Sequence, residues 1–289
     1  MKRIMITGAS GALGSEILPQ LQLMGQVLGL GYRNLLEGLQ AGDIRDEQFL
    51  SGLLKEVRPE VVIHCAAYRD PDFCDAQPEE ARRLNVRPVQ VMNEVLPASS
   101  MIVFISSDYV FDGRNPPYRE ESPCSPINLY GQTKVEAEEL LAGRKRKLIL
   151  RVPLLVGAEG KGRPKGFLGQ AVEAILSGVP VELDDVLVRY PTWTRDVAEA
   201  LRFLLEQEAE GVWHFSGDLR GTRYSITREI AGILGKSADH IQPSQTIVPR
   251  RAQRPPDAHL DDAKIRVQGF RGPTGFRQVV EACRMKPFG

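Results

Sequence analysis

A tyrosine and a lysine one helical turn apart carry the clearest chemical signal in the sequence. Tyr130 and Lys134 lie within residues 128–141, whose composition predicts a helix, and their spacing puts both side chains on one helix face. A free tyrosine has a pKa of about 10 and gives up its proton reluctantly at neutral pH. A nearby ammonium lowers that pKa, so the pair could protonate a carbonyl oxygen while a hydride reaches the carbon. Because Tyr-x-x-x-Lys also occurs by chance in amphipathic helices, its weight depends on what lies upstream.

A glycine-rich turn near the N-terminus predicts a site for a dinucleotide. Residues 2–7 read as a short buried strand, and glycines follow at positions 8, 11 and 14, ahead of helical apolar spacing over residues 13–23. Strand, glycine turn and helix are the context that this motif requires, because glycine lets the backbone approach a pyrophosphate that the helix N-terminus attracts. The residues predicted to contact a cofactor here are Gly8, Ser10, Gly11, Ala12, Leu13 and Gly14.

The end of the second predicted strand, residues 26–30, indicates which dinucleotide is bound. NAD-selective sites usually place an acidic residue here to hold the ribose 2′-hydroxyl. No Asp or Glu occurs between Gln26 and Leu36, whereas Arg33 stands where a 2′-phosphate would lie. The sequence therefore favours NADP(H) over NAD(H), with a solvated loop charge as the alternative reading of Arg33.

Two further predicted strands bring small and hydroxyl-bearing residues to the same edge of a parallel sheet. The strand at 61–64 runs into a stretch of small residues, which would let a cofactor lie close to the backbone. The strand at 101–105 leads to Ser107, whose hydroxyl could donate a hydrogen bond to a substrate oxygen. Serines can also simply end a strand, and the Tyr130–Lys134 pair shortly afterwards favours the catalytic interpretation. His64 ends an apolar strand and is interpreted as a packed core residue without a catalytic role.

The remaining segments complete an alternating pattern of strands and helices. Helices are expected at 46–57 and 82–96, and a proline-rich loop at 112–128 precedes the Tyr130 helix. A helix at 195–206 and a strand at 212–215 are expected to return to the first sheet.

Two basic clusters lie in the second half of the chain. One is flanked by glycines and contains Lys161, Arg163 and Lys165; the other contains Arg250, Arg251 and Arg254. The first cluster would suit a diphosphate clamp or a mobile solvated loop, and both interpretations stay open.

Composition excludes several classes of function. The 289 residues are 42% hydrophobic and 26% charged, and 37 basic side chains balance 37 acidic ones, so global charge predicts neither nucleic acid nor a membrane as partner. The four cysteines form no C-x-x-C pair and the four histidines are scattered, which argues against a zinc site and a disulfide scaffold. The first strand begins almost at once and no apolar run reaches the length of a membrane span, so we expect a reduced, cytoplasmic protein.

These motifs together resemble a known family. The glycine turn at 8–14, Ser107 and the Tyr130–Lys134 pair resemble the extended short-chain dehydrogenase/reductases. Within that group, Ser-Ser-Asp-Tyr-Val-Phe-Asp-Gly at 106–113 resembles the signature of the dTDP-4-dehydrorhamnose reductases. The likeness covers nearly the whole chain, and its other segments are 64–68, 84–86, 126–131, 190–192, 214–217 and 253–255.

The resemblance implies a fold and a set of residue roles. The fold would be α/β, a doubly wound parallel (Rossmann) sheet with a smaller C-terminal α/β substrate domain. The NADP(H)-binding domain would span 1–155, completed by about 190–215, and the substrate-binding domain 156–189 and 216–289.

The resemblance also implies a role for each site residue. Ser107 would polarise the C4 carbonyl of a substrate, Tyr130 would donate the proton, and Lys134 would hold the nicotinamide ribose and lower the Tyr130 pKa. Further implied cofactor contacts are Asp43 and Ile44 at the adenine, with Cys65, Ala66, Ala67, Tyr68, Asn85 and Val152. Implied substrate contacts are Tyr109, Lys161, Arg163 and Arg254.

Two departures from the family pattern divide the functional hypotheses. Related dehydratases carry an acidic residue where this chain has Tyr109, which counts against dehydration. The rhamnose-pathway reductases carry a tryptophan shortly after the strand ending at Arg151, where this chain reads Val-Pro-Leu-Leu at 152–155. That departure, with residues 115–121 and 190–192, resembles the regulatory β subunit of methionine adenosyltransferase.

Two functions are therefore expected. The first is an NADPH-dependent reductase of a 4-keto-6-deoxy nucleotide sugar. The alternative is an NADP-binding regulatory subunit that binds a partner enzyme and has little or no turnover. Neither hypothesis requires nucleic acid, membrane or metal, and a homodimer is left open.

Overall fold

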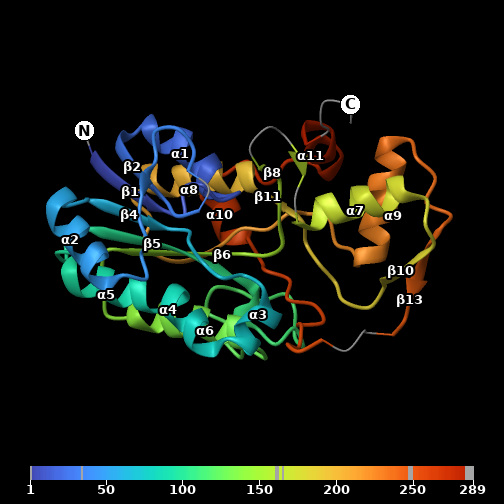
Figure 1. The fold of residues 1–289 in the computed structure, drawn as a ribbon, viewed down its shortest axis with the longest axis horizontal. Coiled ribbons are helices and arrows are strands. Elements are labelled where there is room, and N and C mark those ends of the chain that lie inside the picture. Colours follow the sequence, from blue (N-terminus) through green and yellow to red (C-terminus); the bar gives the residue numbers. More distant parts are fainter. Residues whose placement is uncertain (1, 34, 160–162, 165, 247–249, 284–289) are drawn as a thin grey trace.

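The chain is organised around a seven-stranded parallel sheet with the order β12-β6-β5-β4-β1-β2-β3 (Figure 1). The computed structural model describes residues 2–33, 35–159, 163–164, 166–246 and 250–283. The strands of this sheet are β1 (Lys2–Thr7), β2 (Gly25–Gly31), β3 (Gln40–Ala41), β4 (Val61–His64), β5 (Met101–Ser107), β6 (Lys147–Val152) and β12 (Gly211–His214). Strand order reverses between β1 and β4, which is the arrangement of a doubly wound sheet. The predicted fold class is confirmed.

Helices cover both faces of the sheet, because alternate residues of each strand point to opposite sides. In β1, Ile4 and Ile6 pack toward α1 (Gly14–Gln22) and α8 (Thr194–Glu206). Met5 joins the opposite core, which also contains residues of α2 (Glu47–Val57), α5 (Arg87–Val95) and α6 (Leu129–Leu140). The two helical layers are seen above and below the sheet in Figure 1.

The single helix predicted at 82–96 is wrong in one respect, because the structure divides it. It forms the end of α4 (Pro78–Asn85) and then α5, which begins at Arg87. Pro88 lacks the N–H group that a continuous helix would bond to the Leu84 carbonyl, and a proline is tolerated in the first turn of a helix, so a new helix begins just ahead of it. A short helix that the sequence did not predict, α3 (Pro71–Ala76), precedes α4 and starts at Asp70, whose side chain accepts from the backbone of Asp72.

A second cluster of elements lies beside the carboxyl ends of the central strands. It contains α7 (Gly166–Ser177), β10 (Val181–Asp184), α9 (Arg223–Leu234), β13 (Ile241–Ser244) and α11 (Phe276–Ala282). Strand β10 pairs with β13, and the helices share one apolar core with them. This is the smaller α/β region implied by the resemblance, on the right of Figure 1.

Short elements connect the two regions. They are a 3-10 turn (Asp108–Val110), β7 (Leu155–Val156), β8 (Ala158–Glu159), β9 (Arg163–Pro164), β11 (Thr192–Trp193) and α10 (Ala263–Val267). Ile265 of α10 is buried in the core of the large sheet, with Phe270 packed against it, so the C-terminal segment returns to that sheet. The proposed domain boundaries remain a prediction.

Within the residues that the structure describes, no helix is both long and apolar enough to cross a membrane. The same residues contain no cluster of three or more His, Cys, Asp or Glu side chains suited to a metal ion. All four cysteines carry free thiols.

Candidate active site

The glycine turn lies between β1 and α1, against the end of β4. Gly8 has φ +70°, and a Cβ added there would come within 2.7 Å of the Ala66 backbone nitrogen. The N-terminus of α1 has no side-chain cap; its Ser15 and Glu16 N–H groups donate to Gly11 O and Leu13 O, and the positive end of the helix dipole favours an anion there. A pyrophosphate fits both features.

Replacing Gly8 by alanine is expected to destabilise the protein. The left-handed backbone costs a residue with a Cβ about 1–2 kcal/mol, and the contact with Ala66 pushes β1 away from β4. Gly38→Ala is the matched control, because Gly38 has φ +82° with nothing within 4 Å of an added Cβ. Urea unfolding should show a larger loss for Gly8→Ala than for Gly38→Ala, and equal losses would contradict the steric argument.

The structure brings Ser107, Tyr130 and Lys134 to the carboxyl end of β5; we call them the Ser–Tyr–Lys group. Asn128 starts α6, its side chain accepting a 2.9 Å hydrogen bond from the Gly131 backbone. Lys134 Nζ donates to the carbonyl of Ile105 at 3.0 Å and lies 5.9 Å from the centre of the Tyr130 ring. Catalytic roles for the three remain predictions.

Burial sets the protonation of this group. Desolvation lowers the pKa of Lys134 to about 8. The expectation that the net pKa of Tyr130 is lowered is wrong for this structure: burial raises it above its ordinary value, against the opposing effect of the Ser107 hydrogen bond. A phenol that holds its proton suits a proton donor. Ser107 itself donates to Asp108 Oδ1 at 2.9 Å, and burial raises the pKa of Asp108 to about 6.

His64 is a packed core residue, as interpreted from the sequence. It is 1% exposed, its Nδ1 lies 2.7 Å from Thr7 Oγ1, and its ring stacks on Phe104. Burial, and then the Lys134 charge, lower its pKa to about 3, so the imidazole is neutral.

Asn85 is fully buried and ties the segment after β4 to α6. It accepts from the Tyr68 backbone N–H at 2.8 Å, and its amide nitrogen donates to Tyr68 O and Thr133 Oγ1, both at 3.0 Å. Thr133 in turn donates to Tyr130 O at 2.7 Å. The amide therefore positions residues 65–68 beside α6; direct contact of Asn85 with a cofactor remains a prediction.

The predicted adenosine end contains an arginine that sequence reasoning missed. Arg45 donates to both oxygens of Asp43, at 2.7 and 2.9 Å, and to the Tyr68 hydroxyl at 3.0 Å. This hydrogen bond lowers the pKa of Asp43. Arg45 and the exposed Arg33 both lie over the Tyr32 ring, 5.0 and 5.6 Å from its centre. Ile44 is buried in the core next to α2 rather than open to a ligand.

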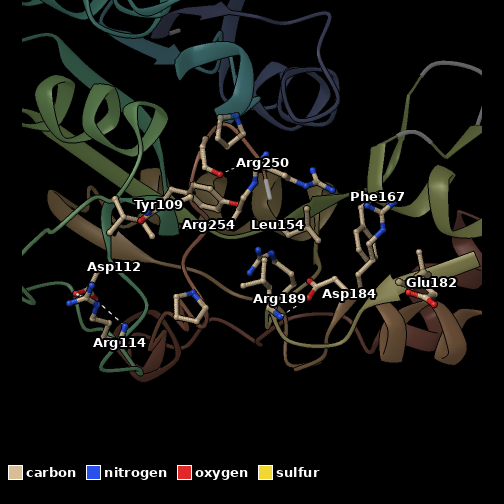
Figure 2. A pocket seen from close by; sticks show the side chains of 18 residues that line it. Tyr109, Asp112, Arg114, Leu154, Phe167, Glu182, Asp184, Arg189, Arg250 and Arg254 are labelled. Atoms are coloured by element: carbon tan, nitrogen blue, oxygen red, sulfur yellow. Dashed lines mark hydrogen bonds and ion pairs between the residues drawn. The ribbon is translucent and has the colours of Figure 1, made fainter. Parts of the chain in front are cut away.

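A cleft of about 710 Å³ opens between the sheet and the smaller region (Figure 2). Tyr109 lines it and contacts Tyr130 edge to face, with 5.6 Å between ring centres. Leu154 and Phe167 give it an apolar wall. The charged residues that line it are Asp112, Arg114, Glu182, Asp184, Arg189, Arg223, Arg250 and Arg254.

The predicted substrate residues have different surroundings. Tyr109 and Arg254 line the cleft, but Arg254 is bound in a bidentate ion pair by Asp72, at 2.8 and 2.7 Å. Lys161 and the Arg163 side chain lie outside the part of the chain that the structure describes. Arg189 and Arg223 were missed as site residues because they are far apart in sequence, whereas Arg250 belongs to the second basic cluster noted in the sequence. Among the described residues, neither Arg223 nor Arg250 forms an ion pair, and their mutual repulsion contributes to lowering the pKa of Arg223, after burial.

The Asp72–Arg254 pair should make stability depend on pH. The Arg254 hydrogen bond lowers the pKa of Asp72 well below its ordinary 3.8, so the pair stabilises the fold above pH 3.8 and loses this contribution as the pH falls further. Thermal unfolding of Asp72→Asn should show a lower Tm than wild type at pH 7, and the gap should narrow below pH 3.8. A gap unchanged down to pH 3 would contradict this role.

The glycine turn, the doubly wound sheet and the Ser–Tyr–Lys group define an extended short-chain dehydrogenase/reductase. Within that class, the chain belongs to the RmlD substrate binding domain family, which matches residues 1–286.

The relatives fall into two functional branches. Methionine adenosyltransferase 2 subunit beta of Mus musculus is 33% identical over 288 residues, covering 97% of this chain and 86% of that protein. The dTDP-4-dehydrorhamnose reductase of Aggregatibacter actinomycetemcomitans is 29% identical over 301 residues, covering 98% and 99%. The crystal structure of a hypothetical dTDP-4-dehydrorhamnose reductase from Sulfolobus tokodaii is 29% identical with a TM-score of 0.84, covering 93% and 95%. The resemblance to both branches is confirmed.

Proposed function

We propose that the protein is an NADPH-dependent reductase of a 4-keto-6-deoxy nucleotide sugar. The observation that carries the proposal is the convergence of Ser107, Tyr130 and Lys134 beside an arginine-lined cleft. Lys134 is 4% exposed and Tyr109 joins Tyr130 to the cleft wall. A reductase of this kind also matches one of the two branches of relatives.

The residues of the chain divide the reaction between them. The turn at Gly8 and the uncapped α1 N-terminus would hold the pyrophosphate of a nicotinamide dinucleotide, which supplies the hydride when bound. Tyr130 Oη gives its proton to the carbonyl oxygen of the substrate as that oxygen gains charge. The Ser107 hydroxyl polarises the same oxygen, and the Lys134 ammonium stabilises the phenolate left behind.

The cleft arginines suit a diphosphate. Arg189, Arg223 and Arg250 come from three segments of the smaller region and its connections, and all three line the cleft. A guanidinium presents a planar fork of donors to phosphate oxygens. Arg223 and Arg250 form no ion pair among the described residues, and the charge of Asp184 in the same cleft only partly offsets their repulsion, so a bound diphosphate would offset it further.

The NADP(H) preference rests on the charges near Tyr32. Arg33 and Arg45 both lie against its ring, and the nearby Asp43 carboxylate forms an ion pair with Arg45. Because Arg45 is paired with both Asp43 and Glu80, Arg33 is the cation that would favour a 2′-phosphate over a 2′-hydroxyl.

The test is NADPH oxidation with a panel of 4-keto-6-deoxy nucleotide sugars that differ in base and in sugar stereochemistry. Turnover with at least one member, and a lower kcat/KM with NADH, is the expected result. NADPH binding without oxidation by any member would contradict the reductase.

A second function is favoured by the cleft wall. Leu154 lines the cleft in the segment where the reductases that the sequence resembles carry a tryptophan, and the 33% identical relative is named as a subunit of methionine adenosyltransferase. A regulatory subunit would bind NADP(H) and that enzyme without turnover. Co-elution of this protein with purified methionine adenosyltransferase in size-exclusion chromatography, with no NADPH oxidation, would support the regulatory function. Separate elution of the two proteins would contradict it.

A further inference from the structure

A buried ion pair lies one helical turn beyond Lys134 and is not part of the chemistry described so far. Tyr130, Lys134 and Glu138 are spaced four residues apart on α6, so they share one face of the helix. The Glu138 carboxylate accepts from Ser106 Oγ at 2.6 Å and from Arg151 Nε and Nη2 at 3.0 and 2.6 Å. The side chains of Arg151 and Glu138 are only 5% and 9% exposed.

The other contacts of Arg151 reach the loop that leads to Tyr130. Its Nη1 donates to the backbone carbonyl of Glu120 at 3.3 Å, and its Nη2 lies 3.3 Å from Cys124 Sγ. His214 Nε2 lies 3.4 Å from Nη1, and burial together with the Arg151 charge lowers the His214 pKa to about 3, so the imidazole does not repel the guanidinium. The Phe111 ring lies under the guanidinium, with 5.2 Å to its centre.

The pair joins β6 to the two elements that carry the Ser–Tyr–Lys group, β5 and α6. Ser106 is next to Ser107 on β5, and Arg151 is opposite Ser106 in the β5–β6 register. Glu138 is on the helix of Tyr130 and Lys134. A shift of α6 along the sheet would therefore have to break the contacts of Glu138 first.

Stability alone explains such a pair poorly. Removing two charges from water costs several kcal/mol per ion, and well-packed apolar side chains of similar volume often stabilise a fold at least as well. Apolar contacts are not directional, whereas hydrogen bonds are. A carboxylate that accepts from three donors in fixed places therefore fixes the position of a helix along its axis and its rotation about that axis.

We propose that the Glu138–Arg151 pair is a positioning device that sets α6 against the end of β5, so that Tyr130 and Lys134 meet Ser107. The effect on turnover rests on the proposed function; the effect on the place of Lys134 does not. Neither Glu138 nor Arg151 is a catalytic residue, since both act through the helix and strand that carry the Ser–Tyr–Lys group.

The test is a rescue experiment with Glu138→Leu, Arg151→Met and the double variant. Each single variant leaves one buried charge unpaired and should lower the Tm. The double variant removes both charges, and we expect its Tm to return to within a few degrees of wild type while kcat stays about 10–100-fold lower, since displacements near 1 Å cost this much. Glu136→Gln is the matched control, because Glu136 is on the same helix but pairs with Arg82, and both side chains are more than one-third exposed.

NADPH affinity is measured in parallel by fluorescence, because it needs no turnover. A double variant with recovered Tm but tenfold weaker NADPH binding supports the positioning role even if wild type reduces no sugar, and in that case the reductase proposal alone fails. A double variant that recovers Tm, kcat and NADPH affinity together would overturn the inference, since the pair would then serve stability only.

Discussion

Tyr130→Phe is expected to lower turnover of the keto sugar by about 10²–10⁴-fold, the range for loss of one general acid. The substitution removes only the Oη–H, and the ring keeps its edge-to-face contact with Tyr109. NADPH affinity should therefore change little. The measurements are kcat from NADPH oxidation and Kd from NADPH fluorescence with the same preparation.

The control for this variant is Tyr224→Phe. Tyr224 lies on α9, and its hydroxyl accepts a 2.9 Å hydrogen bond from Arg228, away from the Ser–Tyr–Lys group. The Tyr224→Phe variant loses the same hydroxyl group, and we expect its kcat to equal that of wild type. If Tyr130→Phe kept more than a tenth of the wild-type kcat, proton donation by Tyr130 would be excluded.

Removing Arg223 and Arg250 together should weaken binding of the nucleotide sugar about 10²-fold or more. Hydrogen bonds to charged groups contribute about 1.5–3 kcal/mol each, or roughly tenfold or more per arginine. The effect should be in KM, with kcat largely retained, because the two guanidiniums would hold the diphosphate and not the reacting carbonyl. Steady-state kinetics of Arg223→Ala/Arg250→Ala, with NADPH saturating, measure it.

Arg228→Ala separates this local effect from a general loss of positive charge. Arg228 is exposed on α9 and contacts Tyr224 rather than the cleft. Its removal should leave KM within about twofold of wild type, as expected for an exposed charge that is screened by water and salt. An equal rise in KM for Arg228→Ala would show that overall charge, not the cleft pair, attracts the substrate.

Local periodicity let the sequence predict the parts of the site that depend on neighbouring residues. The glycine turn follows β1 as predicted, and β1 and β4 have their predicted bounds. Tyr130 and Lys134 share a face because the helix repeat is the same in every protein. The main error in the helices, at Val86, arose from Pro88, whose missing N–H group cannot continue the hydrogen bonding of a single helix.

The tertiary structure decided how charges are paired. Asp72 and Arg254 are 182 positions apart, so nothing in either segment shows that they neutralise each other. Arg254 was therefore expected to be a substrate contact, while Arg189 and Arg223 were overlooked.

The pKa of Tyr130 could likewise not be predicted from the sequence. The Tyr130–Lys134 spacing suggested a lowered tyrosine pKa, yet burial raises it, because desolvation depends on all the elements packed around the phenol. Spacing along a helix is a property of the backbone and can be read from a short segment. Solvation and long-range ion pairs are properties of the packed chain, and they exist only once distant segments have closed around the same side chains.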